Sequence, residues 1–305
     1  MKRTLILLAG LFSGTVLFAQ QTPLSEGYFI DKYSFSPAYA GNYNPKFIFA
    51  GYRSDWTGIK GGPKTFRLSF SDRFMNNSGY GINFIFDKAG IFNQLYLLGT
   101  YSYNLKVNEE NHILFGLSAG LYRNTLNILD YYNDPNYDID PALTGRDINS
   151  KIKIMTNASL VWMWKQLEAG FMFSNIAVGN AHYSNTEIIY RPLANFQGHV
   201  SYSFAPGEDW ELVPLVIVRG GKDMKVQVEA AAQVIYEKKI WGSLVFRDPG
   251  VWGAGIGADL SKGLKLSYNF NFASNVILSA FNSHEITLGF NIFEYTGKKN
   301  SQGTE

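Results

Sequence analysis

The sequence predicts an all-β protein, a transmembrane antiparallel β-barrel of about 14 strands with a short N-terminal pre-barrel segment. Three observations predict this fold class. Apolar and polar residues alternate with a period of two along most of the chain. In the most regular of these segments, the apolar face carries no Asp, Glu, Lys or Arg. The connections alternate between short and long, which is typical of bacterial outer-membrane barrels.

The N-terminus resembles a secretory signal peptide, which we assign to residues 1–19. Lys2 and Arg3 supply its positive end, and an apolar run from Leu5 to Phe18 follows. That run is too short for a membrane-spanning helix, which needs about 20 residues. No other segment approaches 18 consecutive apolar residues, so we expect no helical membrane span.

The composition narrows the class of protein further. The chain has 305 residues and no cysteine, so an exported form has no disulfide framework. The net charge of +2 is too small to indicate nucleic acid as a partner. Aromatic residues make up 16% of the chain and glycine contributes 30 residues, which favours strands and tight turns over helices.

The segment 65–71 illustrates the alternation. Phe66, Leu68 and Phe70 lie on one face, whereas Arg67 and the serines lie on the other. Segments of this kind span about 8–15 residues, which is enough for a tilted transmembrane strand. We expect strands at 46–53, 65–72, 79–87, 93–107, 112–123, 151–164, 167–176, 195–204, 209–218, 223–236, 240–246, 251–260, 264–273 and 283–293. Pro214 makes 209–218 a weak candidate, because proline is disfavoured in central strands.

The position of the charges separates a membrane barrel from a soluble β-sandwich. A Lys or Arg that faces lipid at the membrane midplane costs about 2–4 kcal/mol. Arg67, Asp87, Glu229 and Lys265 all lie on the polar faces. A soluble sandwich would instead carry charges over its outer face, so the pattern favours a barrel with an apolar exterior.

The lengths of the connections orient the barrel. If the chain starts in the periplasm, turns of about six residues or fewer fall on the periplasmic rim, and longer loops such as 124–150 and 177–194 fall outside. We therefore divide the mature chain into a periplasmic or lumenal pre-barrel segment (20–45), an outer-membrane barrel (46–293) and a periplasmic tail (294–305). Trp162, Trp164, Trp241 and Trp252 lie near expected strand ends, as membrane-interface residues do.

Motifs for catalysis or metal binding are weak. The four histidines lack metal-ligand spacing, and no nucleophile and base can be paired, so we predict neither catalytic, cofactor-binding nor metal-binding residues. The loop from Asp134 to Asp140 has part of a calcium-loop pattern, but Ile139 and Gly145 replace its required Gly and Glu. Tyr131, Tyr132 and Tyr137 in this loop either anchor a protein partner or pack on the rim.

The most distinctive sequence segment lies between residues 36 and 65. Ser-Pro-Ala-Tyr-Ala-Gly at 36–41 resembles the Asn-Pro-Ala-Tyr-Ala-Gly signature of the PorP/SprF family, with Ser36 in place of Asn. The family pattern Tyr-Arg-x-x-Trp-x-Gly-x-x-Gly-x-Pro-x-Thr is similar to this chain over 52–65. The matching residues are Pro37, Tyr39, Gly41, Tyr52, Arg53, Trp56, Gly58, Gly61, Pro63 and Thr65. Weaker similarity continues to about residue 293.

The resemblance implies an outer-membrane barrel associated with type IX secretion and gliding motility in Bacteroidota. It implies a non-enzymatic attachment or display platform for exported cargo, such as an adhesin at the cell surface. It also implies contacts with periplasmic type IX secretion components. We expect Trp56, Lys60 and Lys64 in the first external loop to be the partner-binding residues near the signature, although Trp56 could instead only cap the rim.

Two other classes of protein remain as alternatives. An outer-membrane porin or small-solute channel should line its lumen with charges, whereas the expected inward faces here are mostly Ser, Asn, Gln, Thr and Gly. An outer-membrane enzyme lacks its catalytic residues. Because a barrel of about 14 strands lies between filled eight-stranded barrels and open porins, we expect residues 20–45 to plug the lumen.

Overall fold

The computed structural model describes residues 23–128, 148–177, 181–182, 189–190, 195–221, 224–261, 263–274 and 282–292. Three predicted features lie outside these residues: the signal peptide, the C-terminal tail, and the loop that carries the partial calcium-loop pattern and Tyr131, Tyr132 and Tyr137. Of the described residues, no helix is long and apolar enough to cross a membrane.

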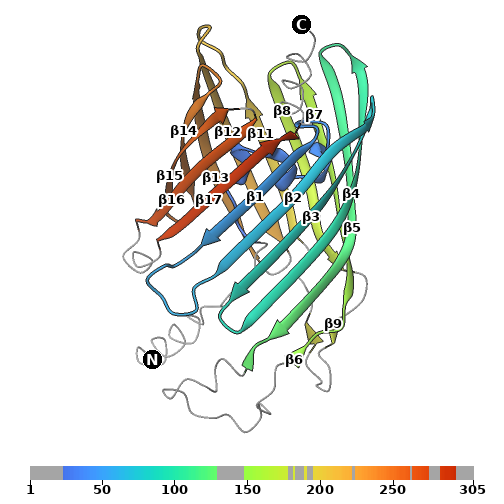
Figure 1. The fold of residues 1–305 in the computed structure, drawn as a ribbon, viewed down its shortest axis with the longest axis vertical. Helices are drawn as coiled ribbons and strands as arrows, with labels where there is room; N and C mark the ends of the chain where they lie inside the picture. The colour runs from blue at the N-terminus through green and yellow to red at the C-terminus, as the bar shows by residue number, and fades with distance from the viewer. Residues whose placement is uncertain are drawn as a thin grey trace, which may run out of the picture.

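The chain forms a closed antiparallel barrel of 14 strands, which confirms the predicted fold class (Figure 1). The barrel strands are β1 (Phe47–Ser54), β2 (Lys64–Met75), β3 (Ser78–Ala89), β4 (Phe92–Asn108), β5 (Asn111–Leu126), β7 (Lys153–Trp164), β8 (Leu167–Ala177), β11 (Asn195–Tyr202), β12 (Trp210–Gly221), β13 (Met224–Tyr236), β14 (Ile240–Arg247), β15 (Val251–Ser261), β16 (Leu264–Ala273) and β17 (Ser283–Asn291). The short strand β6 (Ile148–Asn149) pairs with the end of β5, whereas β9 (Ala181–His182) and β10 (Ile189–Tyr190) pair with each other in a separate two-stranded sheet.

Each barrel strand pairs with its neighbours along the chain, and β1 closes the ring by pairing with β17. The closing register runs from Phe47 opposite Asn291 to Ser54 opposite His284. This closure leaves no free sheet edge, so backbone amides and carbonyls of the strands have partners within the protein.

The alternation predicted from the sequence separates an apolar exterior from a polar interior. Leu117 and Leu244 on the outer face are 58% and 66% exposed, whereas Ser118 and Ser243 beside them are 2% and 6% exposed. Since the exposed side chains of the strands are largely apolar, the barrel presents a surface suited to lipid.

Residues 210–221 form strand β12 although they include Pro214. Pro214 lies opposite Ala232 in the β12–β13 ladder. On its other side, the β11–β12 register runs as far as Ser201 opposite Leu215, and one isolated bridge joins Phe204 to Leu212 beyond it. The ladder is interrupted where a proline without an N–H would have to donate, which explains why the strand tolerates it.

The connections fall on two unlike rims. One rim carries two-residue turns such as 76–77, 109–110 and 165–166. The start of β1 and the end of β17 lie at the same rim. The other carries the 55–63 loop and the long connections after β5, β8 and β16. We call these the short-turn rim and the long-loop rim, and they agree with the predicted alternation of lengths.

Residues 23–45, which we call the lumenal segment, lie inside the barrel. Three 3-10 turns shape it: η1 (Gly27–Phe29), η2 (Lys32–Ser34) and η3 (Pro37–Tyr39). The blue turns in Figure 1 lie behind the front wall of strands. Asp31 caps η2 by accepting a hydrogen bond from the Tyr33 amide at 3.1 Å, and Pro37 opens η3 with a backbone angle suited to a first turn.

Glycines on the inner wall let the lumenal segment approach the strands closely. A Cβ at Gly116 of β5 would lie 2.2 Å from the Ala38 nitrogen, so only glycine fits there. Gly41 has φ +65°, and a Cβ there would lie 2.2 Å from the Asp72 carbonyl oxygen. The signature glycine therefore serves both a turn and a close contact.

Trp241 differs from its predicted place at the membrane interface. It shares the inward face of β14 with Ser243 and Val245, and it packs against Ile30, Phe47 and Phe49 inside the barrel. Although Trp241 lies near a strand end, the period of two directs its side chain into the lumen and not towards the membrane interface.

We predict that Gly116→Val displaces the lumenal segment while the barrel persists, because the added side chain would overlap the backbone of residues 37–38. Limited proteolysis of the folded protein should then cleave within 23–45 at least tenfold faster. Heat-modifiable migration on gels should still report a folded barrel.

Gly99→Val on β4 is the matched control, because a Cβ at Gly99 meets no heavy atom nearer than 3.9 Å. Equal protection of 23–45 in both variants would show that the close contact does not hold the segment.

Candidate functional site

A cluster of buried charges joins the lumenal segment to the first and last strands. Arg53 of β1 lies 3.2 Å from Glu285 of β17 and 3.7 Å from Glu26 of the lumenal segment, measured from Nη1 to the nearest carboxylate oxygen. The Glu26 amide and the Ser25 hydroxyl donate to the two oxygens of Glu285 at 2.8 and 2.5 Å. Asp55 also accepts from the Arg53 guanidinium, at 2.9 Å.

The cluster continues around the inner wall. Arg247 of β14 donates to Glu229 of β13 at 2.5 Å and lies 3.4 Å from Glu26. Glu229 also accepts from Arg219 at 2.9 Å and from the Tyr28 hydroxyl at 2.8 Å. We call this set the ion cluster: Glu26, Arg53, Arg219, Glu229, Arg247 and Glu285.

Burial dominates the electrostatics of the lumenal segment. Burial raises the pKa of Glu26 above its ordinary value, although Arg53 and Arg247 oppose the shift. Burial also raises the pKa of Asp31 to about 6, against hydrogen bonds from the Tyr33 amide and the Ser69 hydroxyl. Charged groups without water depend on their partners, and removing one partner of a buried pair typically costs about 3–5 kcal/mol.

A second polar contact fixes the end of the segment near the short-turn rim. The Tyr39 hydroxyl donates to Glu168 of β8 at 2.5 Å and lies 2.9 Å from Nε2 of His199 on β11. Lys32 of the segment forms an ion pair with Glu168 at 2.8 Å. The lumenal segment is therefore held at both ends by charge-assisted hydrogen bonds.

The predicted signature residues divide between these contacts and the rim. Pro37, Tyr39 and Gly41 belong to the lumenal segment, and Arg53 belongs to the ion cluster. Tyr52 faces outward and is 47% exposed. The first half of the signature thus lies inside the barrel near the start of β1, whereas the second half begins at the other end of that strand.

The 55–63 connection, which we call the rim loop, is an ordered turn on the long-loop rim. The Asp55 amide donates to the Pro63 carbonyl at 2.8 Å, and the Thr57 amide donates to Asn282 at 3.0 Å. The Gly90 amide bonds to Gly61, whose φ is +82°. The loop is tied to both neighbouring connections, so it holds a defined shape.

The candidate partner-binding residues of this region are exposed. Trp56 is 43% exposed at a positive φ of 54°, and Lys60, Lys64 and Gly58 are also exposed. The structure brings Trp56 and Lys60 together on one loop, with Lys64 at the start of the next strand. The other candidates, Tyr131, Tyr132 and Tyr137, lie outside the described residues.

Sequence reasoning missed the ion cluster, although it placed Glu229 on an inward face. A signal was present: Arg53 and Glu285 both lie on inward faces of the first and last strands, which must pair in a closed barrel. Glu26 stands close to them only because the pre-barrel segment enters the lumen, which spacing cannot show. In the part of the chain that the structure describes, no cluster of three or more metal-ligating side chains occurs.

The profile of the family described as type IX secretion system membrane protein PorP/SprF matches residues 17–290. A search of curated proteins found no match to the chain.

Among solved structures, the chain resembles a monoaromatic hydrocarbon channel, CymD, with a TM-score of 0.52 and 12% identity over 85% of this chain and 90% of that one. It also resembles the toluene transporter TbuX of Ralstonia pickettii, with a TM-score of 0.51 and 10% identity over 85% of this chain and 92% of that one. At such low identity, these similarities establish the barrel fold alone.

We predict that Arg53→Gln lowers the free energy of unfolding by about 3–5 kcal/mol, because Glu285 keeps its buried charge without its cation and Glu26 is left with Arg247 alone. Urea titration of the protein folded in lipid vesicles measures this change. Lys106→Gln is the control, since its pair with Glu109 is exposed and should contribute less than about 1 kcal/mol. Similar losses in both variants would contradict the assigned role of the cluster.

The raised pKa of Asp31 predicts a pH dependence of stability. The folded protein binds the Asp31 proton more tightly than the unfolded chain, so the free energy of unfolding should fall as pH rises from about 4 to about 6. Asp31→Asn should remove this component of the slope in urea titrations across that range. An unchanged slope in the variant would assign the dependence to other groups.

Proposed function

Because this chain belongs to the PorP/SprF family of type IX secretion system membrane proteins, we propose that it is a non-enzymatic outer-membrane platform that displays exported surface proteins. Adhesins and other secreted cargo are the proposed occupants of the long-loop rim. Components of the type IX secretion machinery in the periplasm are the proposed partners of the short-turn rim, and lipid surrounds the barrel.

One observation carries this proposal: the barrel is filled by its own N-terminal segment. Charge-assisted bonds from Glu26 and Tyr39 fix that segment at two heights in the lumen. A solute channel would have to displace these contacts, whose loss costs about 3–5 kcal/mol per broken pair. A filled barrel is better suited to hold a partner at its rim than to conduct solutes.

The rim loop supports the same role. The rim loop is linked by backbone hydrogen bonds to the connections on both sides. The loop therefore loses little conformational entropy when a partner binds to Trp56. Tryptophan is enriched among the residues that contribute most to protein interfaces. Lys60 and Lys64 add positive charge beside it, which favours an acidic surface on the cargo.

A cargo-retention assay in the native bacterium tests the platform. Trp56→Ala should reduce type IX cargo on intact cells at least tenfold, because an aromatic anchor of an interface contributes about 2 kcal/mol or more. Surface labelling of the cargo, with the barrel itself quantified in isolated outer membranes, gives the measurement.

Trp164→Ala is the matched control, because Trp164 is similarly exposed, at 46% against 43%, but lies at the short-turn rim. Equal cargo in both variants would contradict the assignment of the rim loop. Liposome swelling tests the remaining alternative: the whole protein should give no uptake of small sugars above protein-free vesicles, and clear uptake would indicate a channel instead.

A further inference from the structure

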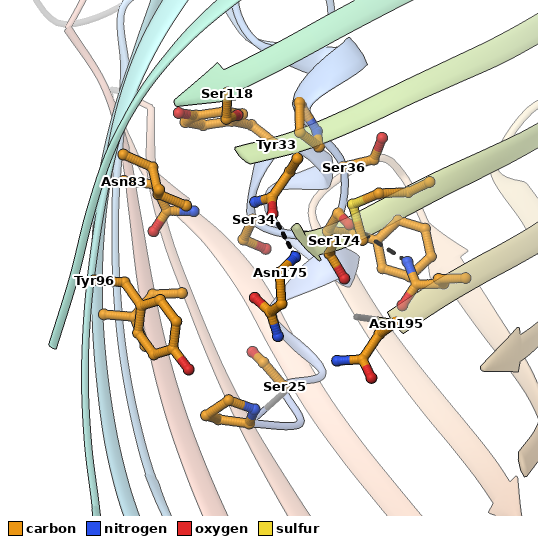
Figure 2. Close-up of a pocket in the computed structure, with 18 of the residues that line it drawn as sticks. Ser25, Tyr33, Ser34, Ser36, Asn83, Tyr96, Ser118, Ser174, Asn175 and Asn195 are labelled. Carbon is orange, nitrogen blue, oxygen red and sulfur yellow. Dashed lines mark hydrogen bonds between the residues drawn. The ribbon is translucent and has the colours of Figure 1, made fainter. Parts of the chain in front are cut away.

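A cavity of about 120 Å³ lies between the lumenal segment and the inner wall of the barrel. Figure 2 shows Asn83 and Tyr96 on one side of it and Asn195 and Ser174 on the other. Its volume is close to that of engineered protein cavities of about 150 Å³ that bind benzene. The cavity can therefore hold one small organic molecule.

Part of the lining is apolar. Ile85 and Leu98 contribute from neighbouring strands, at 7% and 6% exposure, and Phe35 contributes from the lumenal segment. Phe196 and Met172 complete this lining from β11 and β8. Such a surface favours an aromatic or short aliphatic body over water alone.

Arg67 brings a cation to the same cavity. Its side chain is on the inward face of β2 and is 7% exposed. One of its terminal nitrogens donates to the Pro23 carbonyl, but its Nε is buried with no hydrogen-bond partner among the described residues. No carboxylate oxygen of the described residues lies within the 4 Å that defines an ion pair with it, which separates Arg67 from the arginines of the ion cluster.

The two carboxylates whose charges act on Arg67, Asp87 and Glu285, have contact partners of their own. Asp87 accepts a hydrogen bond from Thr65 at 2.6 Å, and Glu285 is paired with Arg53 at 3.2 Å. Arg219, which also lines the cavity, is neutralised by Glu229. A buried guanidinium that lacks an anion is costly, so an anion supplied from outside would be favoured at Arg67.

A second polar group of the cavity lacks a partner. The Ser36 hydroxyl is buried, lines the cavity and has no hydrogen bond within the described part of the chain. Figure 2 labels Ser36 above Asn175, on the lumenal segment. The cavity thus combines an apolar wall, an unpaired cation and a free hydroxyl.

From this combination, we propose that the lumenal cavity binds a small organic carboxylate. Arg67 binds the carboxylate, and the apolar wall contacts the ring or chain that carries it. This site is independent of the proposed display of cargo, because neither the rim loop nor the short-turn rim contributes to it.

Calorimetric titration of the purified whole protein in detergent with benzoate tests the site. Benzoate should bind saturably, and Arg67→Gln should weaken its binding at least tenfold, because a charge-assisted hydrogen bond is lost. Benzyl alcohol, which has the ring without the charge, should bind at least tenfold more weakly to the unchanged protein. Inorganic phosphate, which has charge without an apolar body, should also bind more weakly.

Two further variants keep the test decisive. Asn83→Phe fills the cavity and retains Arg67, so it should also abolish benzoate binding. Arg123→Gln removes an arginine on the exposed outer face of β5 and should leave binding unchanged. Heat-modifiable migration on gels confirms that each variant is folded.

Three results would overturn the proposal. Benzoate could fail to bind the unchanged protein, or bind Arg67→Gln as tightly. Phosphate could bind as tightly as benzoate, which would reduce the site to a bare anion site.

Discussion

Every strand of this protein must cross lipid with its backbone amides and carbonyls paired, and that constraint requires a closed ring. The pairing of β1 with β17 closes this ring. In a closed ring, successive side chains of each strand point alternately to the lipid and to the lumen. Residues that point outward are solvated by hydrocarbon, so they are apolar. Residues that point inward share a space that lipid cannot enter, and the charges of the ion cluster lie there.

The side chains of a 14-stranded ring do not fill its lumen. The interior is too wide to be filled as in an eight-stranded barrel, yet it is lined by polar groups that need partners. The lumenal segment supplies both volume and hydrogen bonds. Glycines such as Gly116 on the wall admit its backbone, and Arg53, Glu168 and Glu285 fix its position.

The sequence predicts the barrel well because its period of two and its charge distribution are local properties. The approximate positions of the fourteen barrel strands follow from these properties, including β12, whose Pro214 lies at a gap in the ladder. The ion cluster was not predictable in the same way, because Glu26 and Glu285 are far apart in sequence and meet only in the lumen. Trp241 shows a related limit: nearness to a strand end and direction of the side chain are separate properties.

The geometry of the ion cluster has a consequence for how the protein is assembled. Arg53 and Glu285 stand opposite each other across the seam where the first and last strands meet. The Glu26 amide can bond to Glu285 beside Arg53 only when that seam has formed, so the cluster is complete only after the ring has closed. In an unfinished barrel the N-terminal segment lacks its final attachment point, and its docking then marks the completion of insertion.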